Sequence, residues 1–306
     1  MNDTNKILFS EPDLDDITTV YTAVDMHVHT RYSDGLGTIP ELVEKARQLN
    51  IGLAVTDHNE IQGAVEINAY DDVLSIPGIE VTTKEGSHLL SYFYDIYELK
   101  HFYKDRIAPF MGNDVMTAVD KEMEDIIENA LEHNGIVILP HPYSAAYTGI
   151  DNINFPEERR ANIFSMIHGV EAINAGNLNR WNLKCALLGF NLNKVITGGS
   201  DAHSVNHIGR AVSYAECEKE KGAFLNALLD RENKVIGKEI DFFDQVTCNS
   251  HKIRTGLKNC PDVIEKNVRY SFSLINTKSK QIKENVKKNI NVRLRKMRAL
   301  NSFSAK

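Results

Sequence analysis

The first 240 residues alternate short apolar, β-branched runs with longer amphipathic segments, and this alternation limits the possible folds more than any other feature. The apolar runs have the length of buried strands, and the segments between them have helical periodicity. Strands that alternate with helices are typical of a parallel α/β architecture. The predicted strands are Thr22–Val28, Gly52–Thr56, Val73–Val81, His88–Tyr94, Gly135–Leu139, Gly169–Ile173, Lys194–Thr197 and Ala211–Ala215.

Four amphipathic helices are predicted to accompany these strands. The first begins at Thr38 and Glu41, which have the spacing of a capping box, and apolar residues follow on one face. The other three follow apolar stripes over residues 119–131, 183–188 and 224–229.

The composition is that of a globular protein. The 306 residues are 42% hydrophobic and 25% charged, and no stretch approaches the ~20 apolar residues of a membrane span. The N-terminus turns acidic at once, unlike a secretory signal. The four cysteines are scattered and include no CxxC pair. We therefore expect a cytoplasmic protein with reduced thiols.

Charge divides the chain near residue 240. Residues 241–306 contain 15 Lys+Arg and 5 Asp+Glu, a net charge of +10, which leaves −17 for residues 1–240. We predict one domain over 1–240 and a basic, mostly helical extension over 241–306. The extension could bind nucleic acid or a membrane surface, or pack on the acidic domain or on a partner. Its lack of interleaved aromatic residues favours packing.

Histidines and acids gather where the predicted strands end. His27 and His29 alternate along the first strand, so both imidazoles can face one ion. In α/β barrels the carboxyl ends of parallel strands converge on the face where active sites are built. The residues concerned are His27, His29, Asp34, His58, Glu80, His88, His141, Asp201 and His203.

Together these nine side chains predict a metal centre. Each motif alone is weak evidence for a metal site, because HxH, DH and HP pairs occur by chance and Gly-Ser-Asp is also common in turns. The joint pattern is hard to explain by packing, since buried polar groups need partners. The donors are nitrogen and oxygen, which suits Mn, Zn, Fe or Co. Nine donors exceed the needs of one ion, so we predict two or three divalent cations with a bridging carboxylate.

The motifs DMHVHTRYSDG, AVTDHNE, PGIEVTT, SHLLSYF, ILPHPYS and GGSDAHS, in this order and spacing, resemble the PHP (polymerase and histidinol phosphatase) domain of metal-dependent phosphoesterases. The resemblance covers roughly residues 22–215 and implies a distorted (βα)7 TIM-like barrel. It also implies three ligand sets, which are His27, His29, Glu80 and Asp201 for one ion, Glu80, His88 and His141 for a second, and Asp34, His58 and His203 for a third.

The resemblance implies hydrolysis of a phosphate ester, with a small phosphomonoester, a nucleotide or an oligonucleotide as substrate. Histidinol-phosphate phosphatase is the alternative within the family, and the chain is too short for a polymerase. The predicted catalytic residues are Asp34, His58, Glu80, Asp201 and His203. The predicted substrate contacts are Arg31, Asn174, His207 and Arg210, with Lys84 as a further candidate.

Two other function classes compete with this interpretation. Amidohydrolase-type chemistry also uses HxH on barrel strands, but the GIE and GSDAH motifs do not match that class. A non-catalytic regulatory module could keep a structural metal site, but the intact set of ligands argues against degeneration. His168 is interpreted as a residue before a buried strand rather than as a ligand.

Overall fold

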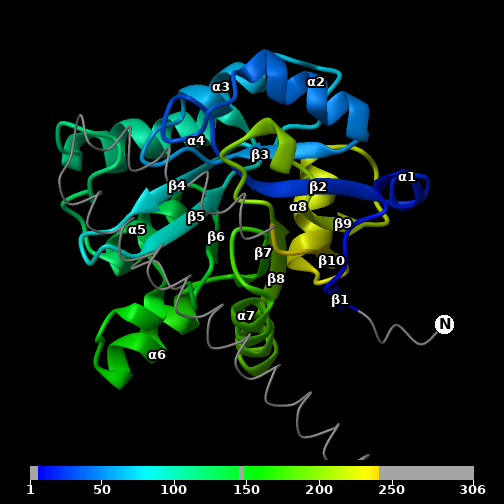
Figure 1. Ribbon diagram of the computed structural model, residues 1–306. Helices are drawn as coiled ribbons and strands as arrows, with labels where there is room; N and C mark the ends of the chain where they lie inside the picture. Colours follow the sequence, from blue (N-terminus) through cyan, green and yellow to red (C-terminus); the bar gives the residue numbers. More distant parts are fainter. Residues whose placement is uncertain (1–5, 145–147, 241–306) are drawn as a thin grey trace, which may run out of the picture.

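The computed structural model describes residues 6–144 and 148–240. Ten strands form two five-stranded mixed sheets (Figure 1). The strands are β1 (Ile7–Leu8), β2 (Thr22–Val28), β3 (Gly52–Val55), β4 (Gly78–Thr82), β5 (His88–Tyr92), β6 (Ile136–Leu139), β7 (Gly169–Asn174), β8 (Val195–Gly199), β9 (Ala211–Ala215) and β10 (Lys234–Gly237). The first sheet has the order β1-β10-β9-β2-β3, and the second has the order β4-β5-β6-β7-β8.

Helices cover the sheets, with α2 and α3 lying above β2 and β3 and α7 packed against β7 (Figure 1). The helices are α1 (Leu14–Ile17), α2 (Ile39–Leu49), α3 (Gln62–Ile67), α4 (Ile96–Phe102), α5 (Met123–Glu132), α6 (Glu157–Met166), α7 (Asn179–Asn191) and α8 (Lys221–Leu229). The predicted capping box is present at the start of α2, where the Thr38 N–H donates to Glu41 Oε2 at 2.8 Å. Within the described ranges, none of the helices has the length and apolar character needed to span a bilayer.

The two sheets meet at single bridges and not in one closed ladder, so the structure confirms the α/β class but shows two mixed sheets where a distorted (βα)7 TIM-like barrel was expected. Beyond β3, His58 pairs with Glu80 in an isolated bridge, and Val28 pairs in the same way with Ala202 beyond β8. The sheets are also mixed, since β5 runs antiparallel to both β4 and β6. Continuous strand pairing between the two sheets is therefore interrupted near the polar residues that follow the strands.

An apolar cluster fills the space that both sheets share with α8. Met26 of the first sheet, Leu90 and Ile138 of the second, and Phe224 of α8 are almost fully buried in it. A larger cluster packs α2, α3, α4 and α5 against the sheets. The two apolar clusters thus hold the strands in fixed positions, and the residues at the strand ends are fixed with them.

The strand boundaries differ from the predicted ones chiefly in two places. The run at 73–81 forms a strand only from Gly78, because the preceding residues make one isolated bridge, between Ser75 and Leu53. The short edge strand β1 and its parallel neighbour β10 were not predicted. The predicted basic extension at 241–306 lies outside the described residues, and so do Cys248 and Cys260.

Candidate metal centre

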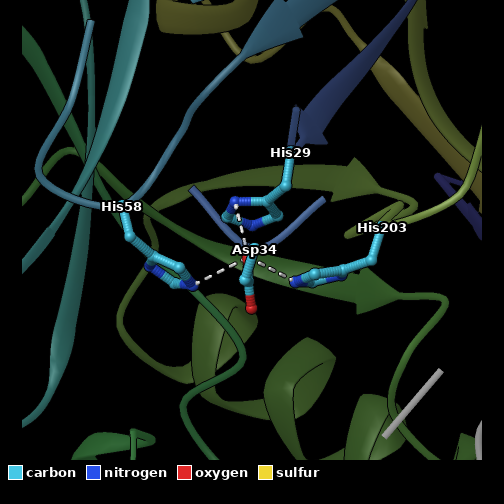
Figure 2. Close-up of side chains that lie close together, drawn as sticks. All are labelled: His29, Asp34, His58 and His203. Atoms are coloured by element: carbon cyan, nitrogen blue, oxygen red, sulfur yellow. Dashed lines mark ion pairs between the residues drawn. The ribbon is translucent and has the colours of Figure 1, made fainter. Parts of the chain in front are cut away.

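All nine predicted ligands lie in one connected cluster where the two sheets meet. Around the Asp34 carboxylate, Oδ1 lies 3.0 Å from His203 Nε2, 3.7 Å from His58 Nε2 and 3.8 Å from His29 Nδ1. Figure 2 shows these three imidazoles pointing at the same carboxylate. They come from three different loops, following β2, β3 and β8.

Glu80 occupies the centre of the cluster, in the middle of β4, and is 1% exposed. Five imidazole nitrogens surround its two carboxylate oxygens. Their distances from the nearer oxygen are 3.4 Å for His27 Nε2, 3.4 Å for His29 Nε2, 2.9 Å for His58 Nδ1, 2.8 Å for His88 Nδ1 and 3.1 Å for His141 Nε2. One carboxylate therefore touches ligands from both sheets.

His88 reaches this cluster in a way that differs from the strand-end rule. It begins β5, which runs antiparallel to β4, and it pairs with Thr82 at the end of β4. The amino end of an antiparallel strand lies at the same edge as the carboxyl end of its neighbour. His88 therefore joins the cluster from the start of a strand.

Asp201 completes the cluster in the loop after β8. Its Oδ1 atom lies 3.1 Å from His29 Nε2, 3.6 Å from His203 Nδ1 and 3.7 Å from His27 Nε2. Asp201 has a φ of 52° and His141 a φ of 31°, which is the left-handed region that non-glycine residues avoid. Such backbone persists only where the surroundings determine it, and it gathers at functional sites.

The donor set fits divalent cations. In three groups of these side chains, the ligand atoms lie within 4.8 Å of one another. The first group is His29, Asp34, His58 and His203; the second is His27, His29 and Asp201; the third is His58, Glu80 and His88. Within the described ranges, the buried atoms His29 Nδ1, Glu80 Oε2 and His203 Nε2 form no well-directed hydrogen bond, although Glu80 Oε2 and His203 Nε2 lie within 3.0 Å of His58 Nδ1 and Asp34 Oδ1, respectively. Leaving such atoms unsatisfied costs about 1–3 kcal/mol each, a penalty that coordination to a cation removes.

These groups overlap more than the resemblance implies. His29 belongs to two groups, and so does His58. The three ligand sets therefore stay a prediction, because the geometry of the side chains alone does not divide them among separate ions.

The surroundings act differently on different ligands: burial alone would lower the pKa of His27, but Asp201, Glu171 and Glu80 raise it well above its ordinary value, whereas His29 and His88 are held neutral. Burial, with His203 and His58 nearby, lowers the pKa of His29 to about 3, and burial lowers that of His88 to about 4. Burial alone would raise the pKa of Glu80, but His88 and His58 hold it well below its ordinary value. Neutral imidazoles and ionised carboxylates are the forms that bind metals.

Comparison with known proteins agrees with this cluster. Residues 25–153 match the PHP domain, and residues 179–233 match the PHP-associated family. Together the two matches cover more than half of the chain. Residues 25–153 belong to the PHP domain family. No curated protein matches it.

Several solved structures share the fold of this chain. One is a two-domain protein from Bacteroides vulgatus ATCC 8482 that contains a predicted PHP-like metal-dependent phosphoesterase, at 18% identity and a TM-score of 0.54, covering 79% of this chain and 72% of that one. PsfC from Pseudomonas syringae PB-5123 has 16% identity and a TM-score of 0.55, covering 78% and 99%. The lesion-specific endonuclease PfuEndoQ from Pyrococcus furiosus has 16% identity and a TM-score of 0.58, covering 82% and 71%.

Two buried carboxylates that the sequence analysis missed hold the ligand-bearing loops of the PHP domain. Asp57 accepts hydrogen bonds from the Thr30 N–H at 2.7 Å and the Ser33 hydroxyl at 2.6 Å, which fixes the turn that carries Asp34. Asp25 accepts the N–H groups of Ser200 and Gly209, both at 2.8 Å. Burial raises the pKa of each carboxyl to about 6. For Asp25 the available sequence signal was an acid inside an apolar strand, whereas Asp57 lies just beyond the end of β3.

The predicted substrate contacts occupy different surroundings. Asn174 lies at the metal cluster, where its Nδ2 donates to Asp201 Oδ2 at 3.2 Å. His207 is buried in the short helical turn Val205–His207. Arg210 is already paired with Glu11.

The two remaining basic candidates lie on the surface. Arg31 is exposed, with its guanidinium 5.8 Å from the centre of the Tyr32 ring. Lys84 is also exposed and pairs with Asp120 at 2.7 Å. Direct contact with a substrate thus stays a prediction for these five residues. His168 accepts the Val137 N–H at 3.1 Å, in line with its interpretation as a residue before a buried strand.

Gly199→Ala is expected to disturb the cluster from the backbone. A Cβ at this position would lie 2.4 Å from His27 Cβ and 2.8 Å from its backbone nitrogen. We expect a loss of about 1–3 kcal/mol in unfolding free energy, measured in urea, together with a lower metal content. The matched control is Gly222→Ala in α8, where a Cβ meets only one side-chain atom at 3.9 Å. That control should keep or gain stability, and equal behaviour of the two variants would contradict the prediction.

Proposed function

We propose that this PHP protein hydrolyses phosphate esters with two or three divalent cations, Mn, Zn or Fe, held by its nine clustered side chains. The observation that carries the proposal is the position of Glu80, whose two oxygens lie within 3.4 Å of five imidazole nitrogens. A buried carboxylate in this setting is suited to bridge cations. Cations bound there would supply Lewis acidity toward a phosphoryl oxygen and make water more acidic.

The protein's own contribution is orientation and charge. His203 donates from Nδ1 to the Asp201 carbonyl oxygen at 2.8 Å, which leaves Nε2 facing Asp34. Asn174 donates to Asp201 and sets the direction of its carboxylate. Asp34, His58, Glu80, Asp201 and His203 are the residues that we assign to catalysis. Fixed groups of this kind stabilise charge in a transition state without reorganising.

The preferred substrate is a small phosphomonoester, a nucleotide or an oligonucleotide. Residues 1–240 carry a net charge of −17, which repels an anion at long range, so the positive charge that attracts it must be local. One solved structure of the same fold is endonuclease Q in complex with a 27-mer duplex that has an abasic lesion at the active site. This likeness supports nucleic-acid esters as one class to be tested.

A substrate panel tests the proposal. The purified full chain, with metal content measured by elemental analysis, is assayed in Mn²⁺ or Zn²⁺ against p-nitrophenyl phosphate, its bis-ester, histidinol phosphate, mononucleotides, bisphosphonucleotides and short single strands. We expect metal-dependent release of phosphate or ester cleavage with at least one of them. A metal-loaded protein that turns over none of these compounds would support the non-catalytic alternative, and a protein that binds no metal would end the proposal.

A further inference from the structure

We propose that Glu171 is a positioning residue for the metal centre, which sets the proton on His27 and holds His141 and Asp201 in place. This inference rests on the proposed function, because the groups that it positions are the proposed ligands. Glu171 was not among the predicted site residues.

The location of Glu171 is unusual for a carboxylate. It lies inside β7, which pairs in parallel with β6 and β8, and it is 1% exposed. Its neighbours along the strand, Val170 and Ala172, are fully buried in the apolar core. A carboxylate in such a strand is costly unless hydrogen-bond donors surround it.

Three donors do surround it, and each belongs to the metal cluster. Oε1 lies 3.0 Å from His27 Nδ1. Oε2 accepts the backbone N–H of His141 at 2.9 Å and the Asn174 side-chain amide at 2.9 Å. The same amide nitrogen also donates to Asp201, at 3.2 Å. One buried carboxylate thereby reaches three of the nine proposed ligands.

The contact with His27 decides which ring nitrogen is available to a cation. We assign the proton of this contact to His27 Nδ1, because a carboxylate oxygen accepts hydrogen bonds and the ring nitrogen donates. In the neutral ring Nε2 then carries the lone pair, and Nε2 is the atom that faces Glu80 at 3.4 Å and Asp201 at 3.7 Å. Carboxylates that fix the tautomer of a ligating histidine also raise its basicity.

The contact with His141 holds a strained backbone. His141 has a φ of 31°, and its N–H points at Glu171. This hydrogen bond helps to fix the conformation that aims His141 Nε2 at Glu80, 3.1 Å away.

Glutamine at this position cannot reproduce the pattern. If its amide oxygen faces His141 and Asn174, its NH2 group faces His27 Nδ1, and the proton of the neutral ring must move to Nε2, which blocks coordination. If the amide is flipped, two donors face its NH2 group. We therefore expect Glu171→Gln to weaken metal binding by about 10- to 100-fold.

The test measures metal affinity by chelator competition with Mn²⁺ and Zn²⁺ in the full chain, for the wild type, Glu171→Gln and the charge control Glu132→Gln. Glu132 is exposed, pairs with Arg106 at 3.0 Å and should tolerate the change. The proton on His27 is read from the ring ¹⁵N signals of the zinc-loaded protein. A structural role alone would lower the melting temperature of the metal-free variant without moving that proton.

The outcomes separate the two proposals. Wild-type affinity in Glu171→Gln, or a His27 proton on Nε2 in the zinc-loaded wild type, would overturn the positioning role and leave the proposed function intact. A wild type that binds neither metal would overturn the proposed function itself. If Glu171→Gln fails to fold, Asn174→Ala decides, since it removes the link to Asp201, and unchanged affinity there would overturn the inference.

Discussion

Glu80→Gln should abolish metal loading and phosphoesterase activity together. The substitution keeps the size of the side chain but removes the charge that five imidazole nitrogens share. An amide nitrogen cannot ligate a cation, and the one remaining oxygen cannot serve both sides of the cluster. We expect a fall in kcat/KM on the order of 10³-fold or more, with metal content near zero.

The measurement combines elemental analysis with turnover of whichever ester the wild type hydrolyses. Glu66→Gln is the matched control, because Glu66 accepts a hydrogen bond from Tyr32 well outside the set of proposed ligands. If Glu80→Gln retained the metal content and rate of the wild type, the assignment of the metal centre would be wrong. Loss of activity with full metal content would instead mean that Glu80 takes part in the reaction and is not needed to bind the metal.

Chelation of the wild type should stop turnover and lower the melting temperature, and added Mn²⁺ or Zn²⁺ should restore both. A ligand that binds only the folded state stabilises it by about 2.7 kcal/mol at a hundredfold excess over Kd. For a chain of this size that corresponds to a shift in melting temperature of roughly 4 °C. The structural reason is the set of buried polar atoms, including Glu80 Oε2 and His203 Nε2, that form no well-directed hydrogen bond.

Differential scanning fluorimetry and a steady-state assay, run on the same chelated and reloaded samples, check this expectation. Because imidazoles must be neutral to bind, metal affinity should also fall as the pH is lowered. A chelated protein with unchanged melting temperature and unchanged rate would contradict the metal centre. Added Mg²⁺, which prefers oxygen donors, is the control cation and should restore less than Mn²⁺ or Zn²⁺.

The gathering of the nine side chains could be predicted from the sequence because strand geometry is periodic and parallel strands end at one edge. His27 and His29 alternate along β2 as expected and Asp201 follows the end of β8, whereas Glu80 lies in the middle of β4 and not at its end. The antiparallel direction of β5 could not be predicted from the sequence. His88 was therefore expected at the correct edge, but not because it begins an antiparallel strand. The interruption of the ladder between the sheets was not visible either.

Contacts between residues that are far apart in the sequence were not predicted. Arg210 was proposed to bind phosphate, but its partner Glu11 lies 199 positions away and no local pattern pairs them. Glu171 and His27 are 144 positions apart. A carboxylate inside an apolar strand signals a buried partner, but it does not say which one, and only the packing of the two sheets identifies it.

The meeting of the two sheets has a mechanical consequence. Backbone pairing between them is reduced to isolated bridges such as Val28–Ala202 and His58–Glu80, in the region where the proposed ligands lie. His27 belongs to one sheet and Glu80 to the other, so a cation held by both would add a link between the sheets beside the backbone hydrogen bonds that cross there, such as those from His29 N–H to the Ala202 carbonyl and from Asn59 N–H to the Glu80 carbonyl. Hydrogen exchange should then report metal loss first at the facing edges β3, β4 and β8, while the inner strands of each sheet stay protected.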